Sequence, residues 1–260
     1  MQKLFLCDVD GTLLKTGSPI HPDVIDAVRT FTGNGGRFAL ATGRPVCAVK
    51  ELLRILPVNA PCVLCSGSVL YDPEKSCVIE ASVMDDSAHE FLRRVLQEHP
   101  DVSVTVCTTH EVFNLRKNRC LCEKGVYEDR TAPLIHPDES LALVKVLFSC
   151  DDPKQLEEIG EKSQESMLFD YHSASVHFSE LTRRGVSKGT AARKLCEKIG
   201  KAEVCKLFVA GDAPSDLTMQ PFAQRFFAPE TAQPVVREKA DFVFPDPKTG
   251  GLAAVFQYIN

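Results

Sequence analysis

The sequence predicts an α/β protein in which a parallel-sheet core is interrupted by a second unit of α+β type. The first third of the chain alternates short apolar runs with stretches of helical spacing, and the last third does the same. The middle third instead shows short strands in pairs with a few helices between them. A strand–helix alternation implies right-handed crossovers and a parallel sheet with both faces covered.

The first third is predicted to contain strands at residues 3–7, 37–41 and 62–65 and helices at residues 22–31 and 45–56. The first helix has apolar residues at helical spacing and starts at Pro22, and Pro57 closes the second helix. Glycines at residues 33, 35 and 36 separate the first helix from the strand that follows it.

From about residue 82 the apolar pattern becomes period-two. Strands are predicted at residues 102–107, 111–115, 144–150, 167–171 and 175–181, and helices at residues 87–98 and 153–163. Residues 121–136 are polar and ambiguous. Paired strands with few helices favour an antiparallel sheet that has one open face.

The alternation of strands and helices seen in the first third returns after Lys188, where a helix is predicted at residues 189–199 and a strand at residues 206–210. A short helix at 215–222, strands at 225–228 and 241–244, a helix at 234–240 and a last helix from 251 follow. A core interrupted by a different unit is most simply one domain inserted into another. We therefore expect a core of residues 1–82 and 184–260 and an inserted domain of residues 83–183.

Composition and charge exclude several classes of protein. With 44% hydrophobic and 25% charged residues, the chain resembles an average globular domain rather than a disordered or fibrous one. Its net charge of −5 leaves no excess of cations for nucleic acid or anionic lipid. Apolar runs are too short to span a membrane, and Asp8 arrives before a signal-peptide core could form. The sequence predicts a cytoplasmic protein without a membrane or nucleic-acid partner.

The 11 cysteines are odd in number and scattered, so we expect free thiols rather than a disulfide framework. Cys62 and Cys65 form one close pair, and Cys120 and Cys122 form another. No histidine follows either pair at the spacing of a zinc site. We interpret most of the cysteines as small core hydrophobes.

Carboxylates follow the predicted core strands at the edge where ligands bind in open parallel sheets. Asp8 and Asp10 follow the first strand, and Asp212 and Asp216 follow a strand near the C-terminus. Gly11 permits a sharp turn, which we expect to leave its N–H open to an anion. Oxygen ligands of this kind are those that Mg²⁺ prefers.

Thr42 and Lys188 are predicted at the same edge and offer a hydroxyl and an ammonium to phosphoryl oxygens. Three acids and a phosphate dianion would bring about five negative charges together, and each like-charge pair at about 4 Å costs roughly 4 kcal/mol at an effective dielectric near 20. Because Lys188 alone cannot offset this repulsion, the cluster calls for a divalent metal.

These segments resemble the four motifs of the haloacid-dehalogenase-like (HAD) phosphohydrolases. The matching segments are Asp8-x-Asp10-Gly11-Thr12-Leu13, Thr42-Gly43-Arg44, Lys188 and Gly211-Asp212-x-x-x-Asp216. All four occur in the family's order, and the insertion resembles the α/β cap of the Cof-type branch, the IIB class. The resemblance implies a Rossmann-like core, a cap that governs substrate specificity and a phosphatase activity on small phosphorylated metabolites, sugar phosphates first.

The resemblance also implies a role for each motif residue. Asp8 would be the nucleophile that forms an aspartyl-phosphate, and Asp10 would be the general acid and then the base. Gly11, Thr42, Gly43 and Lys188 would surround the phosphoryl oxygens, and Arg44 is a candidate substrate contact. Mg²⁺ would be held by Asp8, the main-chain carbonyl of Asp10, Asp212 and, through water or Lys188, Asp216.

Three departures from the family's pattern keep alternatives open. Ser215 stands before the last acid where Asn is usual, Ser66-Gly67-Ser68 replaces an Asn-Gly, and Pro229-Glu230 replaces a Gly-Asn. These departures favour, as one alternative to a phosphatase, a catalytically weak metabolite-binding regulatory protein. A phosphomutase, in which the same aspartyl-phosphate passes to a sugar hydroxyl instead of water, is the other alternative. The sequence singles out no substrate-contacting residue in the cap; its polar candidates are His110, Arg116, Lys117, Arg119, His172, His177 and Arg183.

Overall fold

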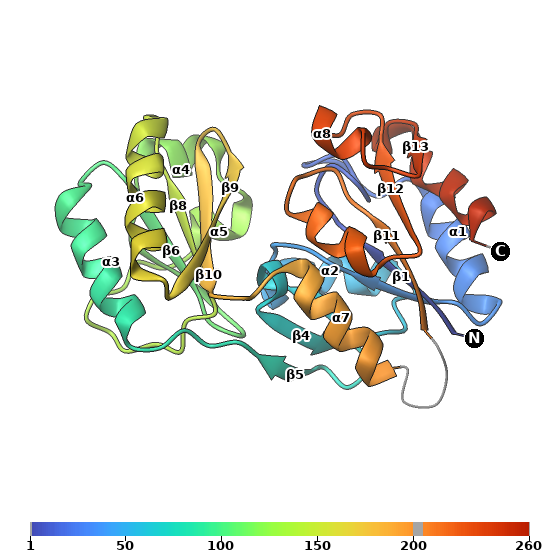
Figure 1. Ribbon diagram of the computed structural model, residues 1–260, viewed down its shortest axis with the longest axis horizontal. Helices are drawn as coiled ribbons and strands as arrows, with labels where there is room; N and C mark the ends of the chain where they lie inside the picture. Colours follow the sequence, from blue (N-terminus) through green and yellow to red (C-terminus); the bar gives the residue numbers. More distant parts are fainter. Residues whose placement is uncertain (1, 200–204, 260) are drawn as a thin grey trace. The chain divides into compact units, whose positions relative to one another are not determined.

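The computed structural model describes residues 2–199 and 205–259, and they form two compact units (Figure 1). The core unit comprises the described parts of Met1–Arg44, Val49–Glu80 and Ser187–Asn260. The inserted unit comprises Pro45–Ala48 and Ala81–Val186. The chain therefore leaves the core unit near residue 80 and returns to it near residue 187.

The sheet of the core unit is parallel, with the strand order β13-β12-β11-β1-β2. Its strands are β1 (Gln2–Cys7), β2 (Arg37–Leu40), β11 (Cys205–Ala210), β12 (Arg225–Pro229) and β13 (Phe242–Phe244). Strand β1 lies between β2 and β11, with Leu4 opposite both Arg37 and Leu207. The pairing of β1 with β11 joins the first and last thirds of the chain.

Helices and 3₁₀ segments cover this sheet. They are α1 (Pro22–Gly33), α2 (Val46–Ile55), α7 (Lys188–Ile199), η2 (Asp216–Phe222), α8 (Pro234–Arg237), η3 (Pro247–Thr249) and η4 (Gly251–Tyr258). On one face, Phe5 of β1 lies 5.8 Å from Phe38 and 5.1 Å from Phe256 of η4, measured between ring centroids. Helix α7 packs against η2 and β11. The α-helices predicted at residues 215–222 and from 251 are 3₁₀ segments, and Pro221 lies inside the first of them.

The prediction of a third parallel core strand at residues 62–65 is only partly right. Strand β3 (Cys62–Leu64) meets β2 at one parallel bridge, Ala41 to Val63. It pairs antiparallel with β4 (Val69–Asp72), and β5 (Cys77–Ala81) completes this small sheet. Cys65 and Ser66, in the 3₁₀ turn η1 (Cys65–Gly67), have positive φ values of 49° and 58° and turn the chain back. Strands β4 and β5 had not been predicted.

The inserted unit is an antiparallel sheet with the strand order β7-β6-β8-β10-β9. Its strands are β6 (Ser103–Cys107), β7 (Val112–Arg116), β8 (Lys145–Ser149), β9 (Phe169–Ser175) and β10 (Phe178–Arg183). Alternate residues of the strands join α3 (Ser87–Glu98) and α6 (Pro153–Ser166) in one hydrophobic cluster. This cluster is a core of its own, built from residues of the inserted unit.

Short helices α4 (Arg119–Lys124) and α5 (Tyr127–Thr131) occupy the stretch that the sequence leaves ambiguous. Asn118 caps α4 by accepting a hydrogen bond from the N–H of Leu121. The buried amide of Asn114 donates to the carbonyl oxygens of Asp129 and Ala132, at 2.8 and 3.1 Å. Contacts with β7, rather than helical periodicity, thus hold this segment in place.

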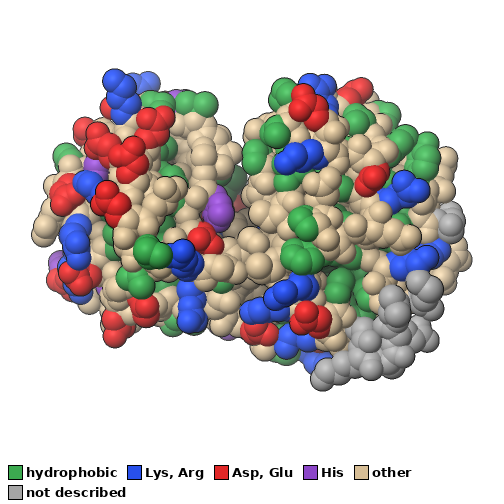
Figure 2. Space-filling model, in the orientation of Figure 1, with side chains coloured by type: hydrophobic (Ala, Val, Ile, Leu, Met, Phe, Trp, Pro, Cys, Tyr) green, Lys and Arg blue, Asp and Glu red, His purple; other side chains and the backbone are tan. Residues whose placement is uncertain are grey.

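Among the described residues, no helix is long and apolar enough to cross a bilayer. On the face shown in Figure 2, basic and acidic side chains are interspersed within each unit.

Candidate active site

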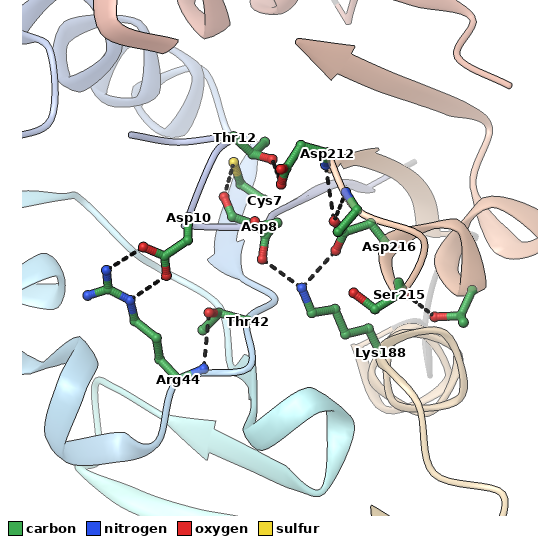
Figure 3. Close-up of polar contacts among 12 residues, drawn as sticks. Cys7, Asp8, Asp10, Thr12, Thr42, Arg44, Lys188, Asp212, Ser215 and Asp216 are labelled. Atoms are coloured by element: carbon green, nitrogen blue, oxygen red, sulfur yellow. Dashed lines mark hydrogen bonds and ion pairs between the residues drawn. The ribbon is translucent and has the colours of Figure 1, made fainter. Parts of the chain in front are cut away.

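The first-strand and late-strand acids meet at one edge of the core sheet (Figure 3). Strands β1 and β11 are parallel and in register, with Cys7 opposite Ala210, so the residues that follow them emerge side by side. The N–H of Asp8 donates to the carbonyl of Ala210 at 2.9 Å and extends this pairing. Convergence follows directly from the strand order, because β1 and β11 are neighbours.

Lys188, the first residue of α7, lies between two of these carboxylates. Its Nζ atom is 2.6 Å from Oδ1 of Asp8 and 2.7 Å from Oδ1 of Asp216. Lys188 and Asp8 are each 5% exposed, and Asp216 is 0% exposed. The three side chains form a buried ion-paired group that fixes the position of the Asp8 carboxylate.

Asp216 also shapes the loop that follows β11. Its Oδ2 atom accepts hydrogen bonds from the N–H groups of Asp212 and Ala213, at 3.1 and 3.0 Å. The Thr12 hydroxyl donates to Oδ1 of Asp212 at 3.0 Å and joins the first motif to the fourth. Thr12 was not predicted as a site residue, although it lies inside the first motif.

Gly11 is required by its backbone angle and by the approach of Asp212. Its φ is +87°, and a Cβ atom there would lie 2.4 Å from Oδ2 of Asp212. The expectation that its N–H is open to an anion is wrong for this structure, because that N–H donates to the carbonyl of Leu14 at 2.8 Å. The segment turns back on itself after Asp10, and the turn uses the N–H.

The acids of the site are buried close together, so their negative charges repel one another. Burial raises the pKa of Asp8 well above its ordinary value, and the charges of Asp216 and Asp212 add to the effect. Burial and the Asp216 carboxylate likewise raise the pKa of Asp212 to about 6. Burial opposes the charge of Lys188, but Asp216 and Asp8 outweigh it and raise the pKa of that ammonium. A further cation would relieve the repulsion that remains.

The same acids form a group able to hold a metal. One carboxylate oxygen from each of Asp8, Asp212 and Asp216 lies within 4.8 Å of the other two. They are hard oxygen donors, the kind that Mg²⁺ takes. The Asp10 side chain is not part of this group; only its main-chain carbonyl was predicted as a ligand.

Asp10 instead pairs with Arg44. Nε of Arg44 lies 2.7 Å from Oδ2 of Asp10, and an Nη atom lies 2.7 Å from Oδ1, a two-pronged contact. The Thr16 hydroxyl donates to the same Oδ1 at 3.2 Å. Figure 3 shows the Asp10 side chain directed toward Arg44, while Asp8 points toward Lys188.

Thr42 follows β2 and is buried, with 2% of its surface exposed. Its hydroxyl accepts a hydrogen bond from the N–H of Arg44 at 3.1 Å across Gly43, and its carbonyl accepts one from Ser66 at 3.1 Å. Gly67, with φ of +106°, packs so closely on α7 that a Cβ atom would lie 2.2 Å from the carbonyl of Ser187. This contact ties the loop after β3 to the residue before Lys188.

The residues that replace the family's amides have other bonds. The Ser215 carbonyl accepts a hydrogen bond from the Thr218 hydroxyl at 2.6 Å. Glu230 accepts one from the N–H of Asp246 at 3.1 Å. These contacts hold the loops after β11 and β12 to their neighbours in the core unit.

Several of the polar candidates in the inserted unit bond within that unit. Arg116 donates to the carbonyl of His99 at 2.9 Å, and Lys117 donates to that of Arg130 at 2.8 Å. Arg119 pairs with Glu123, four residues along α4, at 2.8 Å. These contacts stabilise the inserted unit.

Known proteins resemble this chain over its whole length. A family model for haloacid dehalogenase-like hydrolases matches residues 5–256. Pyridoxal phosphate phosphatase YbhA of Escherichia coli (strain K12) is 24% identical over an alignment of 262 positions, which covers 96% of each chain. A haloacid dehalogenase-like hydrolase from Bacteroides thetaiotaomicron superposes with a TM-score of 0.86 at 21% identity and covers 100% of both chains.

A sugar phosphatase of HAD subclass IIB superposes with a TM-score of 0.83 at 18% identity, covering 100% of this chain and 99% of the other. These matches confirm the predicted fold class and the prediction that the chain is a hydrolase of this superfamily. The chain therefore belongs to the haloacid dehalogenase-like hydrolases.

Proposed function

We propose that the protein is a Mg²⁺-dependent phosphatase that hydrolyses small phosphorylated metabolites, sugar phosphates first, through an aspartyl-phosphate at Asp8. The proposal depends chiefly on one observation, the buried group in which Lys188 contacts Asp8 and Asp216. Asp212 lies close enough to both acids for the three carboxylates to bind one metal ion. A carboxylate fixed beside an ammonium and further acids suits nucleophilic attack on a phosphoryl group.

The Asp8 carboxylate attacks phosphorus, and the bond from phosphorus to the substrate's alcohol oxygen breaks. Lys188 holds the attacking carboxylate in place and offsets the charge that builds up on the phosphoryl oxygens. The Thr42 hydroxyl would donate a hydrogen bond to one of those oxygens. Mg²⁺ held by Asp8, Asp212 and the Asp10 carbonyl, with Asp216 in support, would neutralise negative charge on the transferring group.

Asp10 donates a proton to the departing alcohol and then removes one from the water that attacks phosphorus. That water releases phosphate and regenerates Asp8. For either task the Asp10 carboxyl must face the substrate oxygen, whereas in this structure it is paired with Arg44. Turnover therefore requires one Asp10 oxygen to exchange Arg44 for the substrate oxygen, while the other oxygen can keep its contact with the guanidinium.

Relatives of this chain support a phosphatase function. The Escherichia coli relative is named as a pyridoxal phosphate phosphatase, and a structural neighbour is described as a sugar phosphatase. Both named substrates are small molecules. We place sugar phosphates first and cofactor phosphates second for this chain.

A panel of phosphorylated metabolites, assayed for free phosphate with Mg²⁺ and with a chelator, tests the proposal. We expect release of phosphate that depends on Mg²⁺. Conversion of one sugar-phosphate isomer into another without release would instead indicate a phosphomutase. Binding of a metabolite without any turnover, together with inactivity toward an aryl phosphate, would indicate a regulatory protein.

The Asp8→Asn variant tests the nucleophile. Because Asn cannot form the acyl phosphate, we expect kcat to fall by roughly 10⁴-fold or more, the scale seen when other nucleophiles are removed. The fold should persist, since Lys188 keeps its contact with Asp216. Phosphate release and circular dichroism measure the two effects, with the exposed Asp26→Asn as the control. Activity near that of the control would refute the assignment.

A further inference from the structure

A second group of metal-ligating side chains lies in the inserted unit and shares no residue with the acid cluster. One ligand atom from each of Cys120, Asp151 and His177 lies within 4.8 Å of the other two. Cys120 is in the first turn of α4, Asp151 lies between β8 and α6, and His177 lies in the turn between β9 and β10. The antiparallel sheet brings these three connections together at one end.

The three side chains of this group differ in how far they are buried. Cys120 is 1% exposed, His177 is half-buried and Asp151 is exposed. The Cys120 side chain is thus the most buried of the three, and Asp151 is in contact with solvent. An ion can reach it from solvent.

The histidine has the kind of supporting contact that metal ligands use. Nδ1 of His177 lies 3.3 Å from the carbonyl oxygen of Cys150, and a hydrogen bond there leaves Nε2 with its lone pair. Burial raises the pKa of the Cys120 thiol, the charge of Asp151 adds to the effect, and the Ser149 side chain opposes it. A cation among the three would remove that repulsion.

The three donors differ in kind and so select the ion. Thiolate, imidazole and carboxylate together suit Zn²⁺, which binds sulfur, nitrogen and oxygen in tetrahedral sites. Mg²⁺ takes oxygen ligands and does not use a thiolate. Ligand chemistry therefore separates this group from the oxygen-only cluster of Asp8, Asp212 and Asp216.

We propose that Cys120, Asp151 and His177 bind a zinc ion, with water as the fourth ligand, and that the ion fastens the three connections of the inserted unit to one another. On binding, the sulfur–zinc bond forms and the thiol proton passes to solvent. Lys124, whose Nζ lies 2.7 Å from Oδ1 of Asp151, gives up that exposed contact to the ion.

The test measures zinc directly and does not depend on activity. The protein is stripped with a chelator and dialysed against Zn²⁺ in a large excess of Mg²⁺, which competes with Zn²⁺ for the acid cluster. Bound zinc is then counted in the wild type and in the Cys120→Ser, His177→Ala and Cys122→Ser variants. Cys122 is exposed and lies two residues from Cys120 on α4, so it points elsewhere and serves as the matched control.

We expect one zinc per chain in the wild type and in Cys122→Ser, with affinity at least ~10-fold lower in the other two variants, the scale on which losses around metal sites fall. Cobalt should give a thiolate charge-transfer band that Cys120→Ser abolishes. Zinc should also raise the melting temperature of the wild type but not that of His177→Ala. Because His177 is only half-buried, we expect this variant to fold, so that its loss of zinc binding reflects the missing ligand.

Three results would overturn the proposal. The first is a wild type that retains no zinc under these conditions, and the second is equal retention by His177→Ala and Cys122→Ser. The third is a cobalt spectrum without a thiolate band.

Discussion

At the residue scale, the side chain of Arg44 holds the carboxylate of Asp10 in one orientation. Its guanidinium contacts both oxygens of Asp10, and the residue lies two positions after Thr42 in the same motif. We interpret Arg44 as the residue that positions the proposed general acid. A lysine could supply the charge but not the two-pronged geometry.

Substitution of Arg44 should therefore affect substrates according to their leaving groups. In Arg44→Gln we expect kcat/KM to fall by roughly 10²-fold for sugar phosphates, the lower end of what a general acid contributes, and by much less for an aryl phosphate. Arg44→Lys should recover only part of the loss. Steady-state kinetics on both substrate types measure this, and an equal loss on both would show that Arg44 does not act through Asp10.

Asp212 makes the stability of the metal-free protein depend on pH. Burial and the Asp216 carboxylate raise its pKa from 3.8 to about 6. The folded state therefore holds this proton more tightly than the unfolded state does. The contribution of Asp212 to the free energy of unfolding is largest below about pH 4 and is lost as pH rises through about 6.

Urea unfolding in a chelator at pH 5 and pH 8 measures this dependence. We expect the wild type to lose more stability between these pH values than Asp212→Asn, which has no carboxyl to titrate there. Added Mg²⁺ should stabilise the wild type more at pH 8, because metal ligands must be deprotonated. Identical pH slopes in the two proteins would contradict the account.

At the scale of elements, the loop after β3 and the start of α7 depend on each other. Gly67 lies against the carbonyl of Ser187, and the next residue is Lys188. Anything that pushes these segments apart would move the ammonium away from Asp8. The loop thus contributes to the site without supplying a reacting atom.

Gly67→Ala should lower the free energy of unfolding by about 2–3 kcal/mol, the upper part of the range for single substitutions. Gly17→Ala is the matched control, because Gly17 also has a positive φ, +81°, but nothing lies within 4 Å of its Cβ position. The free energy of unfolding of the control should fall by about 1 kcal/mol, because alanine is unfavourable at a positive φ. Denaturant midpoints and kcat are measured for both; equal effects would show that the Ser187 contact is unimportant.

Elements with strong local signals were predictable, whereas those held by tertiary contacts were not. Strands β1 and β11 contain apolar runs, at residues 4–7 and 207–210, that acids follow closely, so their positions and the meeting of Asp8 with Asp212 follow from the sequence. Helix α5 lacks such a signal, and the Asn114 amide holds it. The group of Cys120, Asp151 and His177 depends on strand register across 57 residues of chain (177 − 120), which composition and spacing do not specify.

At the scale of the whole molecule, the two units have separate hydrophobic cores. In the inserted unit the cluster contains Phe148, which is 0% exposed. In the core unit Phe5 is 0% exposed and contacts Phe31, Phe38 and Phe256. The aromatic partners described for Phe5 all belong to the core unit, so Phe5 and Phe148 report on different clusters.

Phe148→Ala and Phe5→Ala form a reciprocal pair, each expected to cost about 3–5 kcal/mol. Hydrogen exchange followed by mass spectrometry should show faster exchange in β6, β8 and β10 for Phe148→Ala. It should show faster exchange in β1, β2 and β12 for Phe5→Ala. Uniform acceleration throughout the chain in both variants would mean that the two units unfold as one.

The position of β1 between β2 and β11 has a consequence for synthesis on the ribosome. Gln2 pairs with Cys205, so one edge of β1 has no strand partner until more than 200 residues have emerged. Residues 81–186 are complete before then and can fold first, since they hold their own apolar cluster. The nascent chain must meanwhile shield a bare strand edge, which is a template for pairing with other chains. Demand for chaperones should therefore be greatest before β11 leaves the exit tunnel.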